Sequence, residues 1–327
     1  MILVAMLSLS HAAYGQNSRL IMHKPARNLI TEDKLWTEIS FLSDSLCQGR
    51  GTGSAGSVEA AFWVARKFEN AGLMKIDRTW GKAFTSANGT TGHNILGFLP
   101  GSSKNHPDTY VIVGAHYDHL GTIDGRMFPG ADANASGTVA MAALAEMLST
   151  TGSIGVSYSS NIIFAAFDAK EHDMSGSQAL WKLISDGALT DPVTGRKITK
   201  DRIAFMVNID QIGSSLAPLD KGRKDYMIML GNPGLSRSYK DMLHFCNTSY
   251  DIGLDLGMTY YGSENFTKIF YRLSDQRVFA DNRIPAVMFT SGITMNTNKT
   301  RDTVESLDME ILRKRIYLIY HWLEKIL

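Results

Sequence analysis

The sequence has few cysteines and prolines and no excess of charge of either sign. Its 327 residues include 2 Cys, 8 Pro, and 33 Lys and Arg against 32 Asp and Glu. A net charge of +1 without a long basic run excludes the electrostatic surface that nucleic acids or anionic membranes require. Hydrophobic residues make up 44% of the chain, which excludes a disordered or collagen-like protein. We therefore expect a globular protein that does not bind nucleic acid.

The two cysteines, Cys47 and Cys246, lie far apart in the sequence. Distant thiols of this kind are more typical of two separate buried side chains than of a disulfide bond, although an oxidising compartment would permit one. We predict no disulfide bond from the sequence.

Long hydrophobic runs are also absent. No stretch reaches the roughly 18 apolar residues of a transmembrane helix. A short apolar run over residues 1–10 is followed by Ala13 and Gly15, small residues of the kind that signal peptidases recognise. We predict a signal peptide over residues 1–15 and a secreted or periplasmic mature protein. Because no Lys or Arg precedes the run, a start further upstream or a buried N-terminal strand stays open as an alternative.

Short apolar runs alternate with amphipathic segments along the rest of the chain. Runs typical of strands covered on both faces occupy residues 110–115, 161–167, 203–209, 226–230 and 285–289. Apolar residues at helical spacing predict helices at residues 60–72, 137–148, 175–184, 236–245 and 307–326. This alternation predicts a single α/β domain over residues 16–327, a three-layer αβα sandwich with a mixed, largely parallel central sheet.

Ionisable residues follow three of these predicted strands. His116 and Asp118 come directly after the first strand, Lys170 and Glu171 follow the second, and Asp210 follows the third. Ligands of such sheets bind beyond the carboxyl ends of the strands. A His with a carboxylate two residues later suits a metal ligand that is oriented by a hydrogen-bonding partner. By itself, however, the same pair is more typical of a hydrogen-bonded turn.

Taken together, these segments resemble the zinc-dependent exopeptidases, the family that contains the bacterial leucyl-type aminopeptidases and the glutaminyl cyclases. The resemblance covers nearly the whole chain, through residues 42–53, 93–101, 116–118, 130–137, 167–171, 176–177, 208–210, 274–276, 284–285 and 302–303. It implies the zinc-exopeptidase fold. It also implies two metal ions, which polarise the scissile carbonyl and generate a hydroxide nucleophile.

The resemblance assigns metal-binding roles to several residues that this chain retains. His116, Glu171 and Asp210 occupy retained ligand positions. Asp118 and Asp275 occupy the positions of carboxylates that support the ligands from behind. The retained residues alone would leave each metal with at most two protein ligands.

Other positions of the family pattern are substituted. Ala133 stands where the family has the carboxylate that bridges both metals, and Asn298 stands where it has a His ligand. Lys170 replaces the Glu that acts as general base, and Gln276 replaces the His of a Ser-Asp-His segment. The resemblance therefore implies a degenerate metal site.

These substitutions argue against a working enzyme. Zinc sites need three or four protein ligands, and an amide oxygen is a poor replacement for an imidazole. Without a Glu at position 170, no carboxylate takes a proton from water and passes it to the leaving amine. Lysine has an ordinary pKa of about 10.4 and stays protonated. We predict a site without bound metal, in which Lys170 pairs with Glu171 and Asp210 and replaces the charge of the metal ions.

An active alternative stays open. A register change at Asp132, or a swing of His172, would give a third ligand to a single zinc ion held by His116 and Asp210. The protein would then be an aminopeptidase with an unusual mononuclear site, and zinc would be its cofactor.

We favour an inactive homologue that binds a peptide or a peptide-like ligand in the former cleft. Tyr260, Tyr261, Phe266 and Gln276 are our candidates for the lining of that pocket. A purely structural or interaction role without cleft binding is the remaining hypothesis.

Overall fold

The computed structural model describes residues 25–102, 107–215, 225–231 and 236–327. The predicted signal peptide over residues 1–15 lies outside these residues. Within them, no helix is long and apolar enough to cross a membrane.

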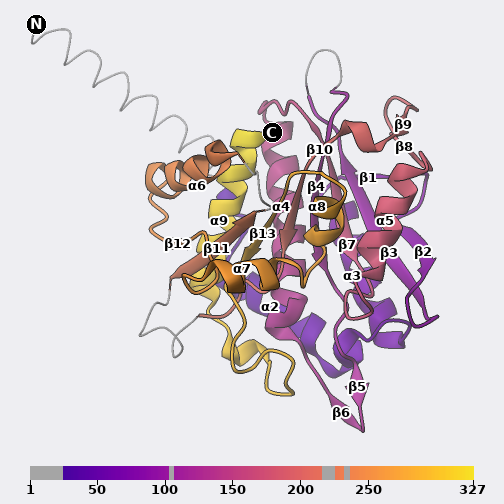
Figure 1. Cartoon of the computed structure of the whole chain (residues 1–327), viewed down its shortest axis with the longest axis vertical. Coiled ribbons are helices and arrows are strands. Elements are labelled where there is room, and N and C mark those ends of the chain that lie inside the picture. The colour runs from indigo at the N-terminus through magenta and orange to yellow at the C-terminus, as the bar shows by residue number, and fades with distance from the viewer. Residues whose placement is uncertain (1–24, 103–106, 216–224, 232–235) are drawn as a thin grey trace, which may run out of the picture.

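A nine-stranded sheet forms the middle of the molecule (Figure 1). Eight of its strands lie in the spatial order β1 (Met74–Lys75), β3 (Thr91–Leu99), β7 (Asn161–Phe167), β4 (Tyr110–His116), β10 (Ile203–Ile209), β13 (Ala286–Thr290), β11 (Tyr226–Gly231) and β12 (Asp255–Gly257). The ninth strand, β2 (Gly81–Thr85), also pairs with β3. Two short hairpins, β5 (Thr122–Ile123) with β6 (Arg126–Met127) and β8 (Leu189–Thr190) with β9 (Lys197–Ile198), lie apart from this sheet.

Parallel pairing dominates the centre of the sheet. Strands β7, β4, β10 and β13 are mutually parallel neighbours. Antiparallel pairs occur towards the edges, where β3 joins β1, β2 and β7, and β11 joins β13. Strand β2 must run antiparallel to β3, because the link between them at residues 86–90 is too short for the crossover that parallel strands need. The predicted mixed sheet is therefore confirmed.

Helices cover both faces of the sheet (Figure 1). They are α2 (Glu32–Ser43), α3 (Ala55–Asn70), α4 (Gly137–Ser153), α5 (Ser175–Ser185), α6 (Arg237–Ser249), α7 (Glu264–Tyr271), α8 (Gln276–Asp281) and α9 (Met309–Ile326). Alternate side chains of one strand enter different clusters, since Val111 and Val113 pack with α3, α4 and α9, whereas Tyr110 and Ile112 pack with α5 and α8. Because β4 is buried on both sides, the three-layer prediction is confirmed.

Capping residues explain where two helices begin. The Ser54 hydroxyl accepts a hydrogen bond from the Ser57 amide at 3.1 Å, so α3 starts at Ala55, five residues before the start that apolar spacing predicts. The Asp308 carboxylate accepts one from the Ile311 amide at 3.1 Å and starts α9. Hydrophobic periodicity alone misses the first turn of α3 because that turn contains mainly small residues.

A buried arginine joins three segments of the chain beside the carboxyl end of β4. The Arg50 guanidinium is fully buried and donates hydrogen bonds to the carbonyl oxygens of Leu42, Tyr117, Pro129 and Gly130 at 2.5–2.7 Å. Burial lowers the pKa of Arg50 to about 10, so the side chain remains charged at neutral pH. The contacts fix the loop after β4 against the segment that leads into α4.

We expect Arg50→Met to lower the free energy of unfolding by about 3–5 kcal/mol, because each buried carbonyl left without a donor costs about 1–3 kcal/mol. Arg237→Met is the matched control, since the Arg237 side chain is 90% exposed and forms an ion pair with Asp241 at 3.6 Å. Urea denaturation of both variants measures the difference. Equal stabilities would show that these hydrogen bonds do not hold the fold together.

Candidate functional site

The carboxyl ends of three parallel strands bring the predicted site residues together. His116 is the last residue of β4, and Asp210 directly follows β10. Lys170 and Glu171 follow the end of β7 at Phe167. Because these three strands are parallel neighbours, the side chains gather at one edge of the sheet, as the sequence predicts.

His116 lies between two carboxylates. Its side chain is 1% exposed, with Nε2 at 3.4 Å from Asp210 Oδ1 and Nδ1 at 3.5 Å from Asp118 Oδ1. Nδ1 is also within 3.1 Å of the Asp118 backbone carbonyl. Burial by itself lowers the pKa of His116, but the charge of Asp210 and the nearby carboxylate of Asp118 outweigh it and raise the pKa to about 10. In the geometry described, His116 is therefore a cation paired with Asp210.

Asp118 connects the loops that follow β4 and β7. Its carboxylate accepts hydrogen bonds from the backbone amides of Lys170, at 3.0 Å, and Glu171, at 3.1 Å. Burial raises the pKa of Asp118, but the His116 contact and these two amides lower it below its ordinary value. Asp118 thus stays ionised and fixes where the Lys170 and Glu171 side chains begin.

Lys170 supplies the second positive charge. Its Nζ lies 3.2 Å from Glu171 Oε1, and the two side chains are 20% and 21% exposed. Burial lowers the pKa of Lys170, but Asp210 and Glu171 more than reverse this effect and raise it above its ordinary value. Burial likewise raises the pKa of Asp210, whereas the charges of His116 and Lys170 bring it well below the usual range. Lys170 is therefore a protonated ammonium in this cluster.

Asp132 and Ala133 lie in the short helical turn Ala131–Ser136 that precedes α4. Asp132 Oδ1 accepts hydrogen bonds from the Gly213 amide at 2.7 Å and from the Ser136 hydroxyl at 3.1 Å. The Asp302 carboxylate accepts the backbone amides of Asp132 and Ala133 at 2.9 and 3.0 Å. These hydrogen bonds hold both the side chain and the backbone of Asp132 in place. The neighbouring Ala133 has only a methyl group, which cannot bind a metal ion.

The donors present do not fit the zinc centre that the resemblance implies. In the part of the chain that the structure describes, no group of three or more His, Cys, Asp and Glu side chains is placed to hold one ion. His172 Nε2 lies 3.3 Å from the Asn88 side-chain amide nitrogen. Neither candidate substitute, Asp132 or His172, thus completes a set with His116 and Asp210. A zinc ion would require rearrangement of at least one of these loops.

A small cavity opens beside Lys170 and Asp210. Its volume is about 140 Å³, and Tyr260 is one of the aromatic residues in its wall. The residues that line it are Ala133, Lys170, Asp210, Gln211, Tyr260, Phe270, Leu273, Ser274, Met288, Thr290, Ile293, Thr297 and Asn298. The substituted positions 133, 170 and 298 therefore all face one cavity.

Three other predicted pocket residues do not line this cavity. Gln276 is fully buried, because its amide accepts from Asn208 Nδ2 at 2.8 Å and donates to the Tyr271 carbonyl. Tyr261 and Phe266 are 39% and 51% exposed on the surface. The Tyr261 hydroxyl donates to the Ile293 carbonyl at 2.9 Å, so this residue contacts the cavity wall from outside.

Asp275 lies behind the cluster without a hydrogen-bond partner for either carboxylate oxygen in the described structure. Burial raises its pKa to about 6, while the charge of His116 acts in the opposite direction. The side chain is fully buried. The role of Asp275 as a carboxylate that supports the ligand positions stays a prediction.

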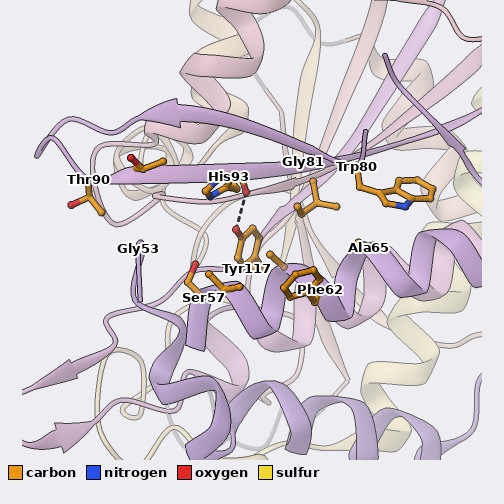
Figure 2. Close-up of a pocket in the computed structure, with 13 residues that line it drawn as sticks. Gly53, Ser57, Phe62, Ala65, Trp80, Gly81, Thr90, His93 and Tyr117 are labelled. Atoms are coloured by element: carbon orange, nitrogen blue, oxygen red, sulfur yellow. Dashed lines mark hydrogen bonds between the residues drawn. The ribbon is translucent and has the colours of Figure 1, made fainter. Parts of the chain in front are cut away.

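A second and larger hollow, of about 730 Å³, lies between α3 and strands β2 and β3 (Figure 2). Phe62 and Trp80 contribute to its largely apolar lining, and the Tyr117 hydroxyl donates to the His93 carbonyl at 2.8 Å. It shares no lining residue with the cavity beside Lys170. The lining of this larger hollow contains no Asp, Glu, Lys or Arg, whereas Lys170 and Asp210 line the smaller cavity. The charged groups of the site therefore lie at the smaller cavity.

The sequence profile of peptidase family M28 matches residues 94–323. The chain belongs to this family. Leucine aminopeptidase 1 of Aspergillus clavatus is 25% identical over 270 residues, which cover 77% of this chain and 59% of that relative. The M28 chain thus spans less than two thirds of the length of the curated relative it matches.

Solved structures share the fold of this M28 chain. The zinc aminopeptidase BSAP of Bacillus subtilis has a TM-score of 0.69 at 15% identity, covering 90% of this chain and 95% of that protein. The glutaminyl cyclase of Fimbriiglobus ruber has a TM-score of 0.68 at 16% identity with the same coverage of each chain. The predicted family and its fold are therefore confirmed.

We expect Lys170→Met to lower the free energy of unfolding by about 1–3 kcal/mol, less than for a fully buried pair because the side chain is partly exposed. A cation whose pKa rises on folding stabilises the fold at all pH values below its unfolded-state pKa of about 10.4, and this stabilisation is lost above the folded pKa. The deficit should therefore be equal at pH 7.5 and pH 9 in chemical denaturation.

Lys182→Met serves as the control for that measurement. Lys182 forms an ion pair with Asp186 at 2.6 Å, but its side chain is 76% exposed. Its loss should change stability by less than about 0.5 kcal/mol. If Lys170→Met and Lys182→Met had the same effect, the Lys170 ion pair would not stabilise the site.

Proposed function

We propose that this M28 chain is a homologue without peptidase activity that binds a peptide-like ligand in the cleft. One observation carries the proposal, namely the Lys170 ammonium at the position of the family's general base, paired with Glu171 at 3.2 Å. A general base must accept a proton from water, and a protonated lysine has no lone pair to do so. The neighbouring carboxylates of Asp210 and Glu171 favour this protonated state.

The metal positions support the same proposal independently. Ala133 and Asn298 face the cavity where the family has a bridging carboxylate and a His. His116, a retained ligand position, is engaged with Asp210 at 3.4 Å and with Asp118 at 3.5 Å. Its imidazole would have to give up its proton before it could bind a metal ion. Zinc is therefore a cofactor of this chain only under the alternative function below.

One observation favours an active enzyme with a single zinc ion. His116 Nε2 and Asp210 Oδ1 lie 3.4 Å apart, close enough for both to contact one ion after small shifts. Asp132 or His172 would then need to move in as third ligand. We rank this alternative second because no described group of three donors is in place.

The proposal also covers the type of ligand and the cellular location of the protein. The aminopeptidase relative supports a peptide-like ligand. The apolar run at residues 1–10, followed by Ala13 and Gly15, supports export of the mature protein to the periplasm or the outside. Secretion is testable by the size of the chain recovered from culture medium and periplasm.

Metal content tests the proposal directly. Protein incubated with zinc and then desalted should retain fewer than about 0.2 zinc ions per chain, and should not hydrolyse leucine p-nitroanilide. The triple variant Ala133→Asp, Lys170→Glu, Asn298→His restores the two substituted metal ligands and the general base, and should retain one or two zinc ions. Elemental mass spectrometry measures the metal, and circular dichroism checks that the variant folds.

Two results would contradict the proposal. Tight retention of zinc by the wild-type chain would establish the mononuclear alternative, especially if hydrolysis followed the metal content. Hydrolysis that resists chelators would show that the chain is active by a route other than zinc. The single variant Ala133→Asp provides a second metal measurement in case the triple variant does not fold, because it adds a third ligand beside His116 and Asp210 and should retain one zinc ion.

A further inference from the structure

The cavity beside Lys170 exposes one cation and one anion to a ligand. Among its lining residues, only Lys170 and Asp210 carry an ionised side chain. They enter from neighbouring segments, the loop after β7 and the end of β10. A ligand that complements both groups therefore carries a negative and a positive charge close together.

Both charged groups retain unused hydrogen-bonding capacity. A lysine ammonium has three N–H donors, and Lys170 gives one to Glu171 at 3.2 Å. A carboxylate has two oxygens with about four acceptor sites, and Asp210 uses some of them for His116, 3.4 Å from Oδ1, and for the Ser274 side chain. The side-chain amides of Gln211 and Asn298 also line the cavity. Neither amide is hydrogen-bonded to another residue within the described part of the chain.

The size of the cavity limits the ligand to about one residue. Pockets for drug-sized ligands usually span about 300–1,000 Å³, whereas a cavity of about 150 Å³ holds a benzene molecule. At about 140 Å³ the cavity belongs to the second class. Its apolar wall, formed by Tyr260, Phe270, Leu273, Met288 and Ile293, suits one aliphatic or thioether side chain.

We propose that this cavity binds a single free α-amino acid with an apolar side chain of about the size of leucine. The ligand carboxylate pairs with Lys170, its ammonium pairs with Asp210, and its side chain contacts the apolar wall. In the first residue of a peptide, a neutral amide takes the place of the carboxylate, so Lys170 would gain no charged partner. This inference rests on the proposed function, because a working zinc site would place metal where the ligand's charged groups bind.

Isothermal titration calorimetry in the presence of a chelator tests the inference. The probes are L-leucine, L-leucinamide, which lacks the carboxylate, N-acetyl-L-leucine, which lacks the ammonium, and the tripeptide Leu-Gly-Gly. L-leucine should bind at least 10-fold more tightly than each of the other three, since charge-assisted hydrogen bonds are the strong ones.

Variants assign the two ends of the ligand. Lys170→Met should weaken L-leucine binding at least 10-fold and change L-leucinamide binding less than 2-fold, whereas Lys182→Met should change neither. Leu273→Glu is a second variant that the fold should tolerate, because Leu273 is 54% exposed at the rim. Its carboxylate removes apolar contact and repels the ligand carboxylate, so L-leucine binding should weaken at least 5-fold.

The possible failures differ between the two proposals. If Leu-Gly-Gly or L-leucinamide bound as tightly as L-leucine, the amino-acid inference would be wrong and peptide binding without hydrolysis would stand. Absence of binding by all four probes would overturn the inference. Chromatography would detect cleavage of Leu-Gly-Gly by zinc-loaded protein. Such cleavage would instead overturn the proposed function.

Discussion

The pairing of buried carboxylates with two cations of the chain itself is the interaction on which the site depends. Asp118, Glu171 and Asp210 converge at the carboxyl ends of β4, β7 and β10, and a buried carboxylate without a counter-charge costs several kcal/mol. His116 and Lys170 supply that counter-charge. The protein's own side chains therefore offset two of the three negative charges that these carboxylates bring to the edge of the sheet.

Backbone groups hold the loops of this site in place. The amides of Lys170 and Glu171 donate to Asp118, and those of Asp132 and Ala133 donate to Asp302. These hydrogen bonds do not depend on which side chain occupies position 133 or 170. We therefore expect the fold of this chain to tolerate side-chain changes at both positions.

The sequence predicts the convergence of the site and five strands of the sheet, β4, β7, β10, β11 and β13, because these follow from local patterns, whereas it misses β1, β2, β3 and β12. Apolar runs define buried strands, and parallel neighbours must place their carboxyl ends at one edge. The direction of a side chain at the start of a short helix does not follow from such patterns. Gln276 turns into the core because Asn208 and the Tyr271 carbonyl take its amide, and both partners are distant or backbone groups.

Arg50 shows the same limit of prediction, since arginine is rarely buried and no local pattern marks this one as an exception. Its role has a consequence for how the chain divides into units. The family profile begins at residue 94, yet the loop after β4 and the approach to α4 receive their hydrogen bonds from position 50. A fragment limited to the profile would lose that donor together with α3. We therefore expect residues 94–323 to depend on the preceding helices as part of their scaffold.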